Sequence, residues 1–214
     1  MKVHTFKPHP WHGIEAWADK EKKILNVYVE IVPGDTVKYE LDKKTGYLKV
    51  DRPQKFSNIV PCLYGLIPQT YCDKHLASYT SEVLDRKSLR GDQDPLDICI
   101  LTERGIQHGD ILLEAIPIGG FRMIDDNEVD DKIIAVLKND AVYGQYKDLS
   151  DCPQKVINRL KHYFLTYKQI PGEKIVPTCE IGEAYGQKEA IEVINLTTRD
   201  YRESFDAASG APLT

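Results

Sequence analysis

The sequence lacks several features that would place it in a specialised class of protein. Its 214 residues contain no apolar run near the roughly 20 residues that a membrane helix needs, so no membrane partner is expected. The net charge is −5, and a chain without a basic excess is not expected to bind nucleic acid. Residues 1–11 contain no apolar h-region, which argues against a secretory signal and predicts a cytoplasmic protein.

Cysteine is scarce, and a nucleotide-binding loop is missing. The five cysteines form no Cys-x-x-Cys pair, and their odd number disfavours a disulfide framework or a zinc site. Reduced and mostly buried thiols are therefore expected. Residues 182–188 are one residue too short for a Walker-type phosphate loop.

What the sequence does contain is a series of short strand patterns. Residues 25–32 and 37–41 alternate apolar and polar side chains, which predicts half-buried strands. Further strands, separated by turn signals, are predicted at residues 47–50, 98–101, 111–118, 121–124 and 133–137. Short strands at this spacing are typical of an antiparallel barrel or sandwich.

Two helices are predicted in the C-terminal third of the chain. Apolar residues recur at helical spacing over 153–168, with Asp151 as the predicted N-cap and Pro171-Gly172 as the stop signal. A second amphipathic pattern predicts a helix over 188–205.

The remaining segments complete a single predicted domain over residues 1–214. Residues 1–23 are expected to form an N-terminal arm that packs through Trp11, and residues 207–214 a frayed tail. Residues 72–90 lack clean periodicity and contain several basic side chains, which predicts an extended loop.

The most informative segment is Asp92-Gln93-Asp94-Pro95-Leu96-Asp97. Two unit charges about 4 Å apart repel by roughly 4 kcal/mol at an effective dielectric constant of about 20. Three close carboxylates therefore need a proton, a cationic partner or a metal ion. Oxygen ligands favour Mg²⁺ or Mn²⁺ over zinc or copper. The alternative interpretation is a surface turn with capping aspartates.

A second acidic cluster spans residues 125–132, where five of the eight residues are acidic. It links two predicted strands, so it could project from the same end of a barrel as the first cluster; a solvated acidic hairpin is the alternative. Neither cluster has the glycine that a calcium loop requires at its sixth position. Metal ions together with Lys, Arg and Tyr side chains would be suited to holding a phosphoryl group.

With these motifs in place, the sequence resembles the family I soluble inorganic pyrophosphatases of the compact prokaryotic type. Residues 92–98 match the family's Asp-x-Asp-Pro-apolar-Asp-apolar signature. The flanking motifs match in order: Lys38-Tyr39-Glu40, Val50-Asp51-Arg52, Pro61-Cys62-x-Tyr64-Gly65, residues 125–132 and Tyr167-Lys168. The resemblance implies a closed five-stranded antiparallel barrel of the OB type, mainly β, with flanking helices. It also implies hydrolysis of pyrophosphate to two orthophosphates by a metal-activated water, with no covalent intermediate.

The resemblance implies a role for each matching residue. Asp94 would deprotonate the attacking water, and Asp97 would bridge two metal ions. The implied metal ligands are Asp92, Asp97, Asp125 and Asp130. The implied phosphate-binding residues are Lys38, Arg52, Tyr64, Tyr167 and Lys168, and the supporting residues are Glu30, Glu40 and Lys132. The spacing of the acidic hairpin favours Asp130 over the adjacent Asp131 as the ligand.

The implied cofactor is Mg²⁺, several ions per site, with Mn²⁺ or other divalent ions as possible substitutes. The implied partners are pyrophosphate, phosphate and further copies of the chain, with a hexamer favoured over a dimer.

Three features depart from the family pattern. Gln93 stands where the family usually has a small residue, and Val60 stands where many bacterial members have a tyrosine. Residues 72–90 are longer than in the shorter bacterial members, and we expect either a basic flap over the site or a subunit contact.

Three other functions remain open at this stage. The first is a metal-dependent hydrolase of nucleotides or other phosphoanhydrides, and the second is a non-enzymatic barrel that binds oligonucleotides. The third is a metal pair formed by His9 and His12, although an N-terminal arm packed by Trp11 is the favoured explanation of that motif.

Overall fold

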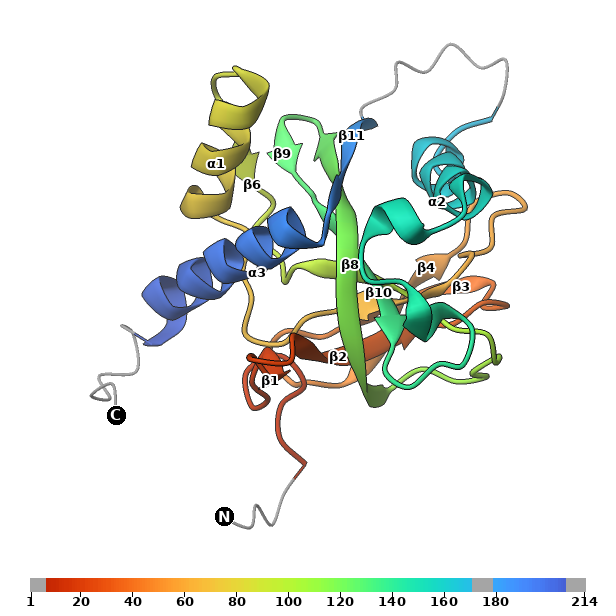
Figure 1. The fold of residues 1–214 in the computed structure, drawn as a ribbon. Coiled ribbons are helices and arrows are strands. Elements are labelled where there is room, and N and C mark those ends of the chain that lie inside the picture. The colour runs from red at the N-terminus through yellow and green to blue at the C-terminus, as the bar shows by residue number, and fades with distance from the viewer. Residues whose placement is uncertain (1–6, 171–178, 207–214) are drawn as a thin grey trace.

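The computed structural model describes residues 7–170 and 179–206, and its centre is a curled sheet that closes on itself (Figure 1). The barrel strands follow the order β2 (Ile24–Ile31), β5 (Leu63–Leu66), β7 (Asp97–Leu101), β10 (Lys132–Leu137) and β8 (Ile111–Asp125). Pairing of β8 with β2 closes the ring. The predicted five-stranded barrel with flanking helices is therefore confirmed.

One detail of the predicted barrel changes, because β10 pairs with β7 in parallel and the barrel is mixed. Strand β10 follows β8 in the chain and pairs with it in the antiparallel sense. On its other side β10 lies beside β7. Since β7 and β8 are not neighbours, the direction of β10 is set by β8 alone. Its parallel relation to β7 follows from that connection.

Strand β8 is a single 15-residue strand, although the sequence predicts two strands separated by a Gly119-Gly120 turn. These glycines mark a close approach of β11 (Cys179–Gly186). A Cβ on Gly119 would lie 2.3 Å from the carbonyl oxygen of Tyr185, and a Cβ on Gly120 would lie 2.5 Å from the Tyr185 ring. The glycines therefore let two backbones pack together without interrupting the strand.

The short strands lie at the rim of the barrel. Strand β1 (Trp17–Asp19) pairs with β2, and β6 (Arg90–Gly91) pairs with β9 (Glu128–Val129). Strands β3 (Val37–Leu41) and β4 (Leu48–Pro53) form a separate hairpin.

Two of the three residues on the polar face of β2 are buried, contrary to the half-buried strand predicted from its alternation. Tyr28 and Glu30 are only 2% and 6% exposed. Tyr28 belongs to a small hydrophobic cluster with Trp11 and Leu41. The N-terminal arm therefore covers this face, and the Trp11 indole donates a hydrogen bond of 2.8 Å to the carbonyl oxygen of Thr70.

Both predicted helices are present as α2 (Gln154–Thr166) and α3 (Gln187–Tyr201), the latter continued by a π-helical turn, η3 (Arg202–Asp206). The predicted N-cap of α2 is wrong, because Asp151 ends the preceding 3₁₀ helix η2 (Leu149–Asp151) and forms a capping box with Asp148. Another 3₁₀ turn, η1, spans Tyr143–Gln145. The predicted stop at Pro171-Gly172 and the predicted tail at 207–214 lie outside the described residues.

Residues 72–90 are not an extended loop, because an 11-residue helix, α1 (Lys74–Leu84), occupies most of them. Its start has no side-chain cap from its own N-cap residue. Instead, the Asp200 carboxylate on α3 accepts hydrogen bonds from the backbone N–H groups of Asp73, His75 and Leu76 at 3.0–3.3 Å. A cap that lies 125 residues away in the sequence leaves no local signal for a helix start, so the sequence does not predict α1.

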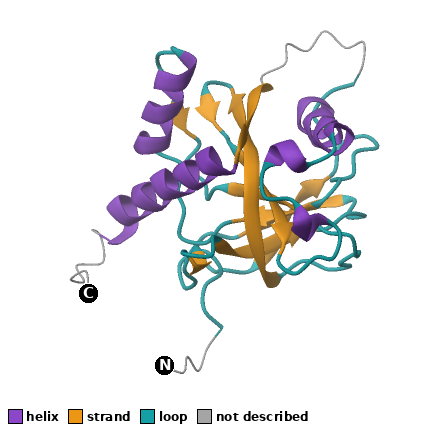
Figure 2. Cartoon of the chain, in the orientation of Figure 1, coloured by secondary structure: helices purple, strands orange, loops and turns teal. Residues whose placement is uncertain are grey.

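The helices lie on two sides of the barrel. Figure 2 shows α1 and α3 together on one side and α2 on the other. No helix among residues 7–170 and 179–206 is long and apolar enough to cross a bilayer. The five cysteines are free and buried, as expected from their number and spacing.

Candidate active site

The two acidic segments meet in one cavity of about 310 Å³. The first follows β6 and leads into β7, and the second joins β8 to β10. Eleven of the predicted site residues line this cavity: Lys38, Arg52, Tyr64, Asp92, Asp94, Asp97, Asp125, Asp130, Lys132, Tyr167 and Lys168. The other two, Glu30 and Glu40, line an adjoining space of about 80 Å³ that shares Asp94 and Asp97 with the first.

The loop that carries the first acidic segment is anchored by backbone hydrogen bonds to Cys72. The Cys72 N–H donates to the carbonyl oxygen of Asp94 at 2.9 Å, and the Gln93 N–H donates to the carbonyl oxygen of Cys72 at 3.0 Å. Gln93 has a φ of 62°, which is left-handed, and its side chain is exposed. The departure at Gln93 therefore places a larger side chain outside the cavity.

Lys132 is the buried cation at the centre of the site. Its ammonium group is bonded to the carboxylates of Asp97 and Asp130, and its side chain is 3% exposed. Burial lowers the pKa of Lys132, but the two carboxylates outweigh that effect and hold it well above its ordinary value. The Tyr64 hydroxyl donates to Asp97 at 2.5 Å. Asp97 is therefore held between an ammonium group and a phenol.

Asp92 and Asp130, one from each acidic segment, line the same cavity, so their negative charges lie near one another. Burial, followed by the nearby Asp130 charge, raises the pKa of Asp92 to about 9. Burial also raises the pKa of Asp130. Two buried carboxyl groups in one cavity favour a proton or a cation that offsets their charge.

Asp130 and Asp131 face opposite ways, which bears on the choice of register. Asp130 lines the cavity, whereas Asp131 is 1% exposed and accepts a hydrogen bond of 2.9 Å from the Tyr185 hydroxyl. Burial raises the pKa of Asp131 to about 7, and the nearby Arg122 opposes that shift. Asp131 therefore belongs to the packing behind the hairpin.

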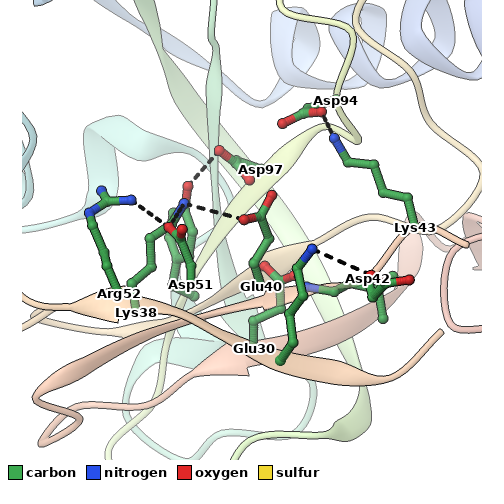
Figure 3. A network of polar contacts seen from close by, with 12 residues as sticks. Glu30, Lys38, Glu40, Asp42, Lys43, Asp51, Arg52, Asp94 and Asp97 are labelled. Atoms are coloured by element: carbon green, nitrogen blue, oxygen red, sulfur yellow. Dashed lines mark hydrogen bonds and ion pairs between the residues drawn. The ribbon is translucent and has the colours of Figure 1, made fainter. Parts of the chain in front are cut away.

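The cationic side of the cavity comes from the β3–β4 hairpin and the end of α2. Lys38 and Arg52 are register partners on the hairpin, and both contact Asp51, with the Lys38 ammonium at 3.1 Å (Figure 3). Lys168 lies just beyond α2, and its ammonium group contacts Asp125 at 2.5 Å. Lys38, Arg52 and Lys168 therefore each have an acidic neighbour that restrains the side chain.

Glu30 supports the site from inside the barrel wall. Its carboxyl group accepts a hydrogen bond of 2.7 Å from the Leu41 N–H, which ties β2 to the β3–β4 hairpin. Burial raises the pKa of Glu30 to about 8, and the charges of Asp97 and Glu40 act in the same direction. Glu40 lies 4.0 Å from the Lys38 ammonium (Figure 3).

The sequence analysis missed several polar residues of the site: Gln54, Glu128 and Tyr163 line the cavity, and Lys43 lines the adjoining space. Lys43 contacts the Asp94 carboxylate from the turn between β3 and β4 (Figure 3). Tyr163 lines the cavity and stacks on Tyr167, with ring centroids 5.3 Å apart. Tyr163 falls on the apolar stripe of α2, which predicts a core residue. Its position one helical turn before Tyr167 is the one sequence signal that could have indicated a place in the cavity. Val60 is 1% exposed and does not line the cavity.

The donor set suits a hard divalent cation, although the carboxylates are not arranged around one point. Among residues 7–170 and 179–206, no three His, Cys, Asp or Glu side chains are grouped closely enough to enclose an ion in this arrangement. The Lys132 ammonium bridges Asp97 and Asp130, and the Lys168 ammonium contacts Asp125. Carboxylate oxygens that already contact two ammonium groups have the chemistry that Mg²⁺ or Mn²⁺ prefers.

Comparison with solved structures identifies the class of fold and site. An inorganic pyrophosphatase from Neisseria gonorrhoeae superposes with a TM-score of 0.72 and 32% identity, over 88% of this chain and 97% of that one. The Thermus thermophilus inorganic pyrophosphatase gives a TM-score of 0.73 and 25% identity, over 91% and 99% of the two chains. The molecule therefore has the fold of the inorganic pyrophosphatases.

Sequence comparison identifies the family. The inorganic pyrophosphatase profile matches residues 27–202. An inorganic pyrophosphatase from Chlamydia muridarum is 54% identical over 200 residues, which cover 92% of this chain and 95% of that protein. This chain belongs to the inorganic pyrophosphatase family, as a soluble pyrophosphatase of family I. The membership predicted from its motifs is confirmed.

Proposed function

We propose that this cavity hydrolyses inorganic pyrophosphate to two orthophosphates with the help of Mg²⁺. The observation that supports this most directly is the meeting of the two acidic segments, which places Asp92, Asp97, Asp125 and Asp130 on the wall of one cavity. Lysine, arginine and tyrosine side chains surround the same cavity, and these are groups that bind phosphate oxygens.

The proposed metal ligands are Asp92, Asp97, Asp125 and Asp130, which line the cavity together. Bound Mg²⁺ would lower the pKa of a coordinated water and offset the negative charge of the two phosphates. Mn²⁺ and other divalent ions with oxygen preference are proposed substitutes. Lys132 would then pair with Asp97 and Asp130 as a supporting residue that limits their mutual repulsion.

Asp94 is the proposed acceptor of the proton from the attacking water. It lines the cavity but, unlike Asp97 and Asp130, has no contact with the central Lys132. Lys43 contacts the Asp94 carboxylate and would hold it in position. With water as the nucleophile, no covalent intermediate on the chain is needed.

The phosphates would be held by side chains on the opposite wall. Lys38 and Arg52 come from the β3–β4 hairpin, and Tyr167 and Lys168 come from the end of α2. Tyr64 contacts Asp97 and would bind phosphate beside the metal ligands. Glu30 and Glu40 would support this wall through Leu41 and Lys38. These donors would orient the phosphates and stabilise charge on the leaving phosphate.

The test is phosphate release from pyrophosphate by the purified chain with Mg²⁺ and after EDTA treatment. We expect release only with the divalent ion. A parallel panel of nucleoside triphosphates and phosphate esters tests the alternative of a broader hydrolase. Hydrolysis of those substrates at rates equal to pyrophosphate, or undiminished hydrolysis in EDTA, would contradict the proposal.

We also propose that the chain acts in the cytoplasm as a homo-oligomer, with a hexamer favoured over a dimer, and without a nucleic-acid or membrane partner. The buried free cysteines support a cytoplasmic location, where thiols stay reduced. The net charge of −5 supports the absence of a nucleic-acid partner. Light scattering coupled to size exclusion measures the number of subunits. A monomeric mass at micromolar concentration would contradict the oligomer.

A further inference from the structure

We propose that Arg90 and Arg86 are positioning residues that clamp the acidic hairpin to the loop carrying Asp92. In doing so they would set the distance between the two groups of candidate metal ligands. This inference rests on the proposed Mg²⁺ site. It assigns a purpose to the long segment of residues 72–90, none of which lines the cavity of about 310 Å³.

The two acidic segments are joined directly by a short parallel ladder. Strand β6 ends at Gly91, immediately before Asp92, and β9 lies between Asp125 and Asp130. Arg90 pairs with Glu128 and Gly91 with Val129, and the Arg90 N–H donates to the carbonyl oxygen of Asn127 at 3.2 Å. Two residues on each strand form a weak ladder by themselves, so other contacts must hold it.

The two arginine side chains supply those contacts. The Arg90 Nε donates to Glu128 at 3.0 Å, beside its own backbone pairing. The Arg86 Nη2 donates to the Asn127 side chain at 3.1 Å, and its other terminal nitrogen contacts Glu180 on β11. Arg86 therefore links the tip of the hairpin to the neighbouring strand.

The hairpin tip needs this support because of its charge. It turns through Asp126 and Asn127, whose φ values of 50° and 65° are those of a tight two-residue hairpin turn that Asp and Asn adopt at little cost. The hairpin carries a high density of negative charge, which favours an open conformation. Arg86 and Arg90 oppose that repulsion from the outer side.

The segment that carries the arginines is itself anchored at its far end. Asp200 on α3 caps the start of α1 through three backbone N–H groups. Gly91 packs so closely on Cys72 that a Cβ there would lie 2.1 Å from the Cys72 carbonyl oxygen. Helix α1 and β6 therefore form a brace that runs from α3 to the hairpin (Figure 1).

Positioning and simple electrostatics predict opposite results, which makes the inference testable. Removing a positive charge near a carboxylate cluster strengthens cation binding if charge alone matters. Removing a clamp that holds the ligands together weakens cation binding. Changes in groups that orient metal ligands typically weaken metal affinity by about 10–100-fold.

The experiment measures Mg²⁺ binding to the EDTA-stripped full chain by isothermal titration calorimetry. The variants are Arg90→Met and the double variant Arg86→Met/Arg90→Met. The matched control is Lys87→Met, which removes the same charge from the same segment at a side chain without a recorded contact. We expect an affinity about tenfold weaker in the arginine variants and an unchanged or slightly stronger affinity in the control.

Hydrogen exchange provides a second measurement that does not depend on metal or activity. We expect faster exchange at the Arg90 amide and at the Asp130 amide, which donates to the Met123 carbonyl oxygen at 2.9 Å, in the arginine variants alone. Both side chains are partly exposed, at 65% for Arg90 and 37% for Arg86, and Arg90→Gln is a milder substitution if the methionine variant unfolds.

Unchanged or tighter Mg²⁺ binding in folded arginine variants would overturn the inference, as would equal weakening in Lys87→Met. Failure of the proposed function is separately visible. In that case the wild-type chain would release no phosphate from pyrophosphate with Mg²⁺, whatever its variants bind.

Discussion

Lys132 and Asp97 face each other across the parallel pairing of β10 and β7, where they are register partners and their side chains form a buried ion pair. Each is the first residue of its strand. The pairing of the two strands therefore brings the first acidic segment, which ends at Asp97, against the second, which ends at Lys132. The same pairing that places β10 in the barrel therefore assembles the site.

Replacing Lys132 with methionine tests the repulsion among the aspartates. The variant leaves Asp97 and Asp130 without their buried cation, and breaking such a pair costs about 3–5 kcal/mol. We expect this loss of unfolding free energy in EDTA and a smaller loss in Mg²⁺, because a divalent ion offsets the same charges. Urea unfolding under both conditions measures it.

The control for that experiment is Lys138→Met, which breaks the partly exposed pair with Glu114. Such pairs contribute about 0–1 kcal/mol, so little change is expected. Equal losses in EDTA and in Mg²⁺ for the Lys132 variant would mean that no cation takes over its role.

Asp97 and Asp94 should respond differently to substitution. Asp97→Ala removes a proposed metal ligand, so we expect loss of most turnover together with weaker Mg²⁺ binding. Asp94→Asn removes the proposed proton acceptor, so we expect lower turnover, by about 10²-fold or more, with less effect on Mg²⁺ affinity. Steady-state kinetics and calorimetry separate the two. Wild-type turnover in either variant would contradict the role of that residue.

Tyr163 offers the cavity a hydroxyl group that the sequence analysis overlooked. No hydrogen bond within the described residues is recorded for this hydroxyl, and the ring stacks on Tyr167. We expect Tyr163→Phe to lower kcat/KM for pyrophosphate by about tenfold, the effect of one hydrogen bond to a charged group. Tyr146→Phe, outside the cavity lining, is the matched control. Identical kinetics for the two variants would exclude Tyr163 from substrate binding.

The raised pKa of Asp92 predicts how pH and Mg²⁺ combine to set stability. Burial and Asp130 raise this pKa from 3.8 to about 9, so the folded chain retains a proton that the unfolded chain loses. Stability from this group is therefore present below about pH 4 and is lost as the pH rises toward 9. Mg²⁺ competes with that proton, so its stabilising effect should grow over the same range.

Thermal melting in EDTA and in Mg²⁺ between about pH 6 and pH 9 measures this coupling. We expect the gap in Tm between the two conditions to widen with pH. Asp92→Asn removes the titrating group and should narrow the gap at high pH. A gap that stays constant in the wild-type chain would show that Asp92 does not take up a proton on folding.

Asp200 should be essential for α1, because it caps that helix from α3. Asp200→Ala leaves three backbone N–H groups without their acceptor, and we expect a loss of about 2 kcal/mol in unfolding free energy. Glu192→Ala, an exposed position on the same helix, is the control. Hydrogen exchange in α1 should accelerate in the first variant only. Unchanged protection there would contradict the capping role.

Much of the site was predictable because its residues lie in short local motifs. Asp92, Asp94 and Asp97 fall within six residues, and the strand that holds Lys38 shows clear alternation. The strand patterns predicted a barrel or a sandwich, and the family resemblance implied the closed barrel. The helix α1 was missed, as were β5 and β11, since their ends and partners are supplied by distant parts of the chain.

The sequence by itself determined which carboxylates are close neighbours along the chain and that their charge needs a counterion, because electrostatic repulsion between adjacent residues requires no fold. Only the tertiary structure decided that Asp130 faces the cavity while Asp131 bonds to Tyr185. It also decided that residues 74–84 form a helix, through the Asp200 cap. Both outcomes depend on partners more than 50 residues away, whose positions are set by the closing of the barrel.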